Sequence, residues 1–77
     1  MVKQIQLELQ ATLKRFLPAA HESYVIEPGL RVRDLLAQLG IPEHEVNLIF
    51  INGGLANLDA TVSGGERVVL YPPLGGG

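Results

Sequence analysis

The feature that most restricts the fold is one clear amphipathic helix in a chain of only 77 residues. Its apolar residues are spaced at i, i+3, i+4 and i+7, so they form one stripe: Val32, Leu35, Leu36 and Leu39. Asp34 in the first turn interacts favourably with the helix dipole, although Arg31 at the cap position is a weak capping residue. Gly40 suits the left-handed residue after the helix, and Ile41 can fold back onto the last turn before Pro42 prevents continuation. The sequence therefore predicts a helix from about Val32 to Leu39, with one face packed on a core.

Two segments before the helix have strand patterns. Apolar and polar residues alternate over 4–10, with Ile5, Leu7 and Leu9 on one side, as in a strand with one buried and one solvated face. The second strand, 23–27, is short and is followed by a turn formed by the next proline and glycine.

The alternation fails between these two strands. Leu13, Phe16 and Leu17 are spaced like one helical turn, which Pro18 ends. We therefore expect 11–22 to be a packed connection rather than a strand.

Three strands are expected after the helix. The segment 42–45 is predicted to form a single turn, and 46–51 is apolar nearly throughout, as in a strand covered on most of both faces. Asn-Gly-Gly at 52–54 predicts a hairpin turn into a short strand near Leu55. An irregular stretch and the turn Ser-Gly-Gly at 63–65 then lead to a last strand over 66–71.

These elements indicate an α+β fold with one main helix across one face of a mixed sheet of four to five strands. The first and last strands must share the centre of the sheet, because otherwise one helix could not cover both. That arrangement is a β-grasp, the ubiquitin-like roll. We expect residues 1–71 to form this domain and 72–77 to form a flexible C-terminal tail.

Composition narrows the function. There are no cysteines, which removes disulfides, thiolate nucleophiles and cysteine-based metal sites. The formal net charge is −2 at pH 7 with no basic cluster, which argues against nucleic-acid binding. The N-terminus alternates apolar and polar residues, with no apolar block for a signal peptide or membrane span. We therefore expect a cytoplasmic protein that binds no membrane.

No stand-alone active site is visible in the sequence. His21 and His44 lie in predicted surface connections far apart in the chain, so no metal site is expected. Ser23 and Ser63 have no base beside them and suit turns. The paired glycines in the two turns do not form a strand–loop–helix phosphate cradle.

The tail is the remaining candidate for chemistry. The chain ends in "YPPLGGG", residues 71–77. Pro72 and Pro73 favour a stiff, extended backbone and end the last strand. Leu74 is one apolar handle, and the glycines after it have no side chains. From Pro72 to Gly77 the tail reaches roughly 20 Å when extended. It could thread a crevice as narrow as a main chain, although a frayed terminus is the alternative.

An apolar docking face is expected beside the tail. If Val68 and Leu70 point inward, then Val69 and Tyr71 point outward on the side of the sheet away from the helix. One alternating set from Leu48–Ile51 must join them, because a strand cannot hide both faces beneath one helix. The pattern leaves open which set this is. A contiguous exposed apolar patch indicates a partner surface, and a homodimer contact is the alternative.

The ending "YPPLGGG" resembles that of the MoaD/ThiS family of ubiquitin-like sulfur carriers, and is most similar to the small subunit of molybdopterin synthase. "LRVRDLLAQLG" (30–40) looks like the family helix, "LIFINGG" (48–54) like its strand ending in Asn-Gly, and "VSGGERVVLYPP" (62–73) like the run before the tail. Two positions depart from the family pattern: Arg31 stands where a threonine cap is frequent, and Gly65 where an acidic residue is usual.

The resemblance implies an activity. A ubiquitin-activator-like enzyme uses ATP to adenylate the carboxylate of Gly77, and a sulfur donor displaces AMP to leave a thiocarboxylate. The large subunit of molybdopterin synthase, or another sulfur acceptor, then receives the sulfur. The carrier itself binds no cofactor. Residues expected to bind partners are the tail and its root: Gly76, Gly75, Leu74, Pro73, Pro72, Tyr71 and Val69.

Two alternatives share the tail chemistry. A thiamin sulfur carrier of the ThiS type would pass sulfur to a thiazole precursor, but such carriers usually lack both the diproline and a connection like 11–22. A ubiquitin-like protein modifier would instead form an isopeptide bond between Gly77 and lysines of target proteins. The sequence does not exclude this third role.

Overall fold

The computed structural model describes residues 2–73. Its elements in chain order are β1 (Lys3–Leu9), the 3-10 helices η1 (Ala11–Phe16) and η2 (His21–Ser23), β2 (Tyr24–Ile26), β3 (Leu30–Arg31), α1 (Val32–Leu39), the 3-10 helix η3 (Glu43–Glu45), β4 (Leu48–Ile51), β5 (Gly54–Ala56), β6 (Thr61–Val62) and β7 (Arg67–Tyr71). Within this range no helix is long and apolar enough to cross a membrane.

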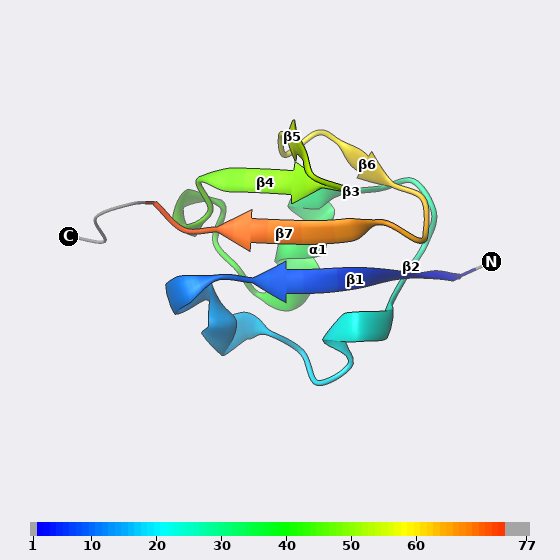
Figure 1. Cartoon of the computed structure of the whole chain (residues 1–77), viewed down its shortest axis with the longest axis horizontal. Coiled ribbons are helices and arrows are strands. Elements are labelled where there is room, and N and C mark those ends of the chain that lie inside the picture. The colour runs from blue at the N-terminus through cyan, green and yellow to red at the C-terminus, as the bar shows by residue number, and fades with distance from the viewer. Residues whose placement is uncertain (1, 74–77) are drawn as a thin grey trace.

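The five-stranded sheet has the order β2-β1-β7-β4-β5, and α1 lies across one of its faces (Figure 1). The first and last strands, β1 and β7, are parallel neighbours, with Leu7 opposite Val68 and Leu9 opposite Leu70. All other pairings in this sheet are antiparallel. The predicted mixed sheet and its central pair are confirmed, and the fold is a β-grasp.

The core lies between the sheet and α1. Ile5, Leu7 and Leu9 of β1 are buried, as predicted from their alternation. On the helix, Val32, Leu35 and Leu36 are fully buried, and Leu39 packs against the same cluster while half-buried. The connection 11–22 is packed as expected, because Leu13 of η1 is 0% exposed. Burial of this kind is the main stabilising contribution in a domain this small.

The C-terminus of α1 follows the sequence closely. Gly40 has φ +77°, in the left-handed region, and its N–H donates to the carbonyl of Ala37. The N–H of Ile41 donates to the carbonyl of Leu36 at 2.9 Å, and the Ile41 side chain is buried. These two bonds form a Schellman motif, which satisfies carbonyls that the helix leaves without partners.

The N-terminus of α1 is satisfied in a way that the sequence does not reveal. Arg31 makes no side-chain capping bond. Instead, the N–H of Val32 donates to the carbonyl of Ala60 at 2.8 Å, and that of Arg33 donates to the carbonyl of Leu58 at 3.0 Å. The stretch expected to be irregular thus caps the helix. It also contains β6, which pairs with β3 in a two-stranded ladder too short to show alternation.

The strand β4 is shorter than predicted, although none of its residues is fully exposed. The apolar run 46–51 was predicted to be a strand covered on most of both faces. The strand begins at Leu48, and only Ile49 is buried, while Leu48, Phe50 and Ile51 are partly exposed. Ile51 packs against the core on the same face as Ile49, whereas Leu48 and Phe50 lie on the other face and are only partly covered by their neighbours.

Candidate functional site

The candidate site lies on the outer face of the sheet, which is the face away from α1. Val68 and Leu70 of β7 point inward and are 0% exposed. Val69 and Tyr71 therefore point outward, because successive side chains of a strand alternate. Their partners on β4 are Phe50, opposite Val69, and Leu48, opposite Tyr71. The alternating set that the sequence left open is thus Leu48 and Phe50.

A shallow groove crosses this face. It has a volume of about 240 Å³ and is lined by Glu8, Phe50, Gly53, Arg67, Val69 and Tyr71. The rings of Phe50 and Tyr71 form one wall. Val69 is only 9% exposed although it is not part of the core cluster, so it forms the floor of the groove. Tyr71 is 38% exposed, and Leu55 of β5, opposite Phe50, is 70% exposed.

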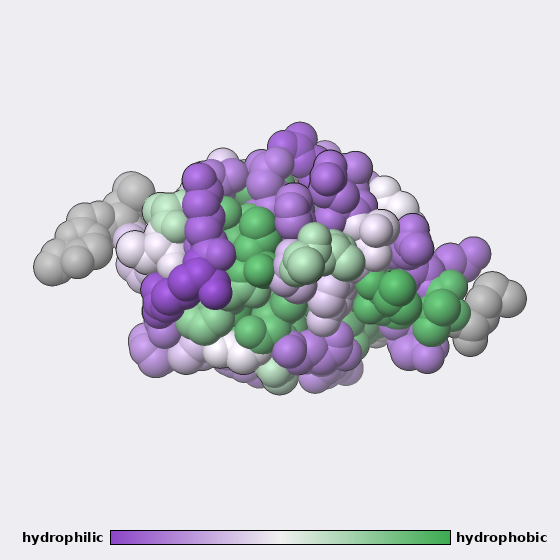
Figure 2. Space-filling model, turned by 90° about the horizontal axis from the view of Figure 1, so that it is seen from below, coloured by the Kyte–Doolittle hydropathy of each residue, from purple (hydrophilic) through white to green (hydrophobic). Residues whose placement is uncertain are grey.

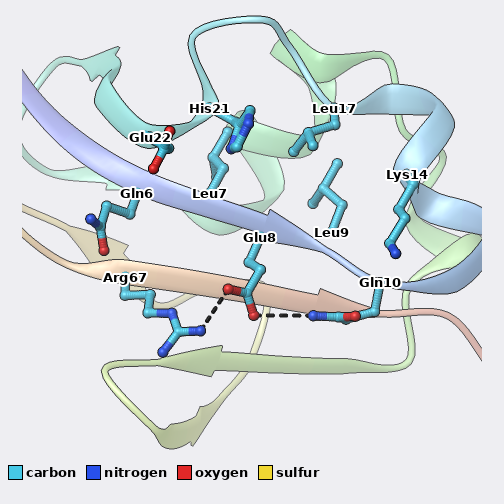
Figure 3. A pocket seen from close by; sticks show the side chains of 10 residues that line it. All are labelled: Gln6, Leu7, Glu8, Leu9, Gln10, Lys14, Leu17, His21, Glu22 and Arg67. Carbon is cyan, nitrogen blue, oxygen red and sulfur yellow. Dashed lines mark hydrogen bonds and ion pairs between the residues drawn. The ribbon is translucent and has the colours of Figure 1, made fainter.

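The other wall is charged. Arg67 Nη2 donates to Glu8 Oε1 at 2.6 Å, and Gln10 Nε2 donates to Glu8 Oε2 at 3.0 Å (Figure 3). The hydrogen bond to the Glu8 carboxylate, together with its negative charge, raises the pKa of Arg67 above its usual value. The groove therefore has an aromatic wall and an ionic wall, with an apolar floor between them.

Asn52 holds Arg67 in position. The Asn52 N–H donates to the Arg67 carbonyl at 2.9 Å, and the Arg67 N–H donates to Asn52 Oδ1 at 3.0 Å. Asn52 itself has φ +52° and Gly53 has φ +82°, as in the type I′ turn expected of Asn-Gly between two strands. The predicted hairpin turn thus also fixes the backbone of the residue that forms the ionic wall.

A second, larger groove of about 480 Å³ runs between β1 and the connection 11–23 (Figure 3). Leu7, Leu9 and Leu17 line its apolar part, and Lys14 and His21 belong to its polar part. Glu8 and Arg67 line both grooves, so the ionic wall lies between them. Seen from below the view of Figure 1, apolar surface lies between polar groups near the middle of the molecule and again toward one end (Figure 2). No group of three or more residues able to hold a metal ion occurs within residues 2–73.

The root of the tail is firmly held at the end of the sheet. The Gln10 N–H donates to the Leu70 carbonyl at 3.0 Å, and the Asn47 N–H donates to the Tyr71 carbonyl at 2.8 Å. Pro72, which is half-buried, and Pro73, which is exposed, follow outside any strand. The remaining predicted site residues, Leu74, Gly75, Gly76 and Gly77, lie outside the described residues.

The structure therefore brings two of the predicted partner-binding residues, Val69 and Tyr71, into one groove beside the tail root. It also adds three residues that sequence reasoning missed as site residues: Glu8, Phe50 and Arg67. Phe50 belongs to one of the two alternating sets in β4 between which the sequence could not choose. Glu8 and Arg67 are far apart in the chain and gave no signal without the register of β1 on β7.

The topology and the outward groove define a ubiquitin-like protein of the β-grasp fold. The chain belongs to the Mut7-C ubiquitin family, which it matches over residues 2–75. No curated protein matches it.

Solved structures agree on the fold. The chain is similar to the HVO 2177 protein of Haloferax volcanii, with a TM-score of 0.74 and 19% identity over 99% of this chain and 88% of the other. It is similar to a putative molybdopterin converting factor, subunit 1, from Pyrococcus furiosus, with a TM-score of 0.64 and 24% identity over 94% and 99% of the two chains. It is also similar to SAMP1 from Haloferax volcanii, with a TM-score of 0.64 and 22% identity over 96% and 99%. The resemblance to ubiquitin-like proteins is confirmed.

Proposed function

We propose that this chain is a sulfur carrier for molybdopterin biosynthesis, in which the carboxylate of Gly77 is adenylated and converted to a thiocarboxylate. The observation that most supports the proposal is the continuity between the groove and the tail. Tyr71 lines the groove and is the residue directly before "PPLGGG". A partner that binds the groove therefore holds the root of the tail in a defined position, from which Pro72 and Pro73 favour an extended path.

The chemistry needs little from the carrier. A carboxylate is a poor electrophile until one oxygen becomes a good leaving group, which adenylation by ATP provides with release of pyrophosphate. A sulfur nucleophile then attacks the carbonyl carbon of Gly77, and AMP leaves. Glycines near the carbonyl carry no side chain to obstruct that attack and accept whatever dihedral angles the partner's channel requires. The activating enzyme supplies the ATP site, so the carrier binds no cofactor of its own.

The folded body has to supply most of the affinity for the activating enzyme. Ordering one flexible residue costs roughly 1–2 kcal/mol of backbone entropy, with glycine at the high end. Gly75, Gly76 and Gly77 offer no side-chain contacts to offset that cost. The groove beside Val69 and Tyr71 is the surface on the described residues that is best placed to offset it.

Protein modification through Gly77 is the second candidate. Two structural neighbours are described as SAMP1 and as small archaeal modifier protein 1, at 22% and 20% identity. The chemistry is the same up to the activated carbonyl, after which a lysine amine of a target protein attacks instead of a sulfur nucleophile. A thiamin sulfur carrier remains the third candidate, with the same thiocarboxylate and a different acceptor.

Intact-mass analysis of the protein purified from its native host tests these candidates together. Sulfur carriage predicts a form in which one oxygen of the Gly77 carboxylate is replaced by sulfur, formed in an ATP-dependent way. Modification predicts branched peptides in which the end of this chain is joined to lysines of other proteins. If neither form occurs, or if Gly77 is followed by further residues in the mature protein, the proposal is wrong.

A further inference from the structure

Arg67 is positioned to bind a group that no described residue supplies. Guanidinium has five N–H donors in a planar fork, and within residues 2–73 the Arg67 side chain uses its Nη2 alone, to donate to Glu8. In Figure 3 the other terminal nitrogen of Arg67 points away from Glu8 and toward the β4–β5 side of the sheet. That is the side on which the groove lies, since Phe50 and Gly53 line it together with Arg67.

Glu8, in contrast, uses both of its carboxylate oxygens within the described residues. Its two oxygens accept hydrogen bonds from Arg67 and from Gln10. The carboxylate thus orients the guanidinium while leaving its remaining donors available. Asn52 also holds the backbone of Arg67 in place through two hydrogen bonds. The free donors of Arg67 are therefore directed into the groove from a fixed position.

We propose that Arg67 determines the specificity of this face, and that the partner segment bound here carries an apolar side chain and, next to it, a single carboxylate. The apolar side chain lies on Val69 against Phe50 and Tyr71, and the carboxylate accepts hydrogen bonds from the free edge of Arg67. The inference rests on the proposed function only in taking the outer face as the docking surface.

The shape and charge of the groove select this ligand class. Its 240 Å³ is roughly eight times the ~30 Å³ that one water molecule occupies in the liquid, enough for one large side chain. Because Glu8 neutralises Arg67, the wall has no net positive field to attract a nucleotide or another polyanion. A single carboxylate held in the planar fork of Arg67 gains charge-assisted hydrogen bonds without that field.

The same arrangement discriminates against other partners. A partner that covers Arg67 without an acceptor leaves buried N–H donors unsatisfied, which is costly. A lysine or arginine at the same place brings only N–H donors and cannot accept a hydrogen bond from Arg67. A glutamine or asparagine offers an acceptor without charge and forms a weaker bond. Arg67 therefore favours an acidic residue over its amide and over a basic residue.

NMR titration of the isotope-labelled full chain with two short peptides tests the binding step. The probes are N-acetyl-leucyl-glutamic acid α-amide and its matched glutamine peptide, which differ only in the side-chain carboxylate. We expect the acidic peptide to bind about threefold to tenfold more tightly, with shifts at Gly53, Val69 and Tyr71. The preference should disappear in Arg67→Gln and persist in Arg31→Gln, which removes the same charge from β3.

A third variant distinguishes binding to the free donors of Arg67 from binding to the Arg67–Glu8 ion pair. Glu8→Gln keeps an acceptor for Arg67 but removes the competing negative charge, so the acidic peptide should bind as tightly as to the wild type or more tightly. If Glu8→Gln weakens binding as much as Arg67→Gln does, the partner recognises the Arg67–Glu8 ion pair as a whole rather than the free donors of Arg67, and the inference is wrong. Equal affinity of the two peptides, or shifts confined to Lys14, Leu17 and His21 of the larger groove, would also overturn it.

The activating enzyme of the same host gives an independent readout. Because Arg67 acts in docking, Arg67→Gln should raise KM for adenylation about tenfold while kcat changes little. If the wild type is adenylated and Arg67→Gln has an unchanged KM, the inference is wrong and the proposed function stands. If the wild type is not adenylated, the proposed function fails, and the peptide titration still decides whether Arg67 binds a carboxylate.

Discussion

Phe50 and Tyr71 meet edge to face on the outer surface of the sheet, with ring centroids 5.7 Å apart and planes at 84°. The two residues are diagonal neighbours, since Phe50 stands directly opposite Val69 and Tyr71 directly opposite Leu48. The contact therefore links the middle of β4 to the last residue of β7. It fixes the aromatic wall of the groove at the point where the tail begins.

We predict measurable coupling between these two rings. Aromatic pairs in this geometry contribute about 0.5–1.5 kcal/mol beyond their buried area. A double-mutant cycle of Phe50→Leu and Tyr71→Leu, followed by urea unfolding, should give an interaction free energy in that range. The cycle of Phe50→Leu with Tyr24→Leu is the control, because Tyr24 lies on β2 at the other side of the sheet and should show no coupling. An interaction free energy of zero for the Phe50–Tyr71 cycle, as for the control, would mean that the ring contact does not persist in solution.

Core packing predicts a large difference between two leucines. Leu36 is 0% exposed beneath the sheet, whereas Leu55 is 70% exposed. Leu36→Ala leaves a cavity and should lower the free energy of unfolding by roughly 2–5 kcal/mol. Leu55→Ala makes the same chemical change on the surface and should stay within about 0.5 kcal/mol. Denaturant unfolding of both variants measures this, and equal losses would contradict the assignment of the faces.

Glu66 makes stability depend on pH. Partial burial raises the pKa of its carboxyl, but hydrogen bonds from the backbone N–H groups of Ser63, Gly64 and Glu66 outweigh this, so the pKa lies below its usual value of 4.5. The bonds from Ser63 and Gly64 measure 2.8 and 2.6 Å. A carboxyl with a depressed pKa in the folded state adds stability at pH values above its unfolded pKa, and this is lost as pH falls through the folded pKa.

Glu66→Gln should therefore lower the melting temperature at neutral pH. The difference in melting temperature between this variant and the wild type should narrow as the pH falls below 4.5. Glu22→Gln serves as the control, because Glu22 is exposed and has no hydrogen bond or ion pair within residues 2–73. Thermal melts across this pH range decide the matter, and a gap that stays constant would show that the carboxylate charge is not what holds the turn.

Sequence patterns determined most of the fold because each acts locally. The alternation of Ile5, Leu7 and Leu9, the helical spacing before Gly40, and the Asn52-Gly53 turn each depend on residues close together in the chain. The central position of β1 and β7 followed from geometry, because one helix can cover the first and last strands only if they share the centre of the sheet. The small ladder of β3 and β6 was not predictable in this way, because two residues carry no period.

The candidate site was predictable only in part, because it is built from register. Val69 and Tyr71 follow from alternation within one strand. Glu8 and Arg67 meet only because β1 and β7 are parallel neighbours at that register. The alternating set of β4 that faces outward likewise depends on how β4 pairs with β7. Long-range register is a tertiary property, so local spacing does not predict it.

The last prediction concerns the tail, where the fold and the proposed chemistry can be separated. The core side chains end with Leu70 of β7, and glycines have no side chain to pack against them, so we expect changes to Gly76 and Gly77 to leave the melting temperature unchanged. Deleting Gly77 moves the carboxylate back by about 3.3–3.6 Å, and misplacement of about 1 Å at a reacting centre can reduce a rate about a hundredfold.

Three tail variants make the test. Deletion of Gly77 and addition of one residue after it both relocate the carboxylate, so both should abolish thiocarboxylate formation. Gly76→Ala keeps the reach but adds a methyl group to a segment expected to fit a channel for bare backbone, and it disfavours any positive φ. We expect a reduced rate for this variant, measured as ATP-dependent thiocarboxylate formation by intact mass, with unchanged melting for all three. Full activity in the Gly77 deletion would end the sulfur-carrier proposal, because the reacting carbonyl would then not be that of Gly77.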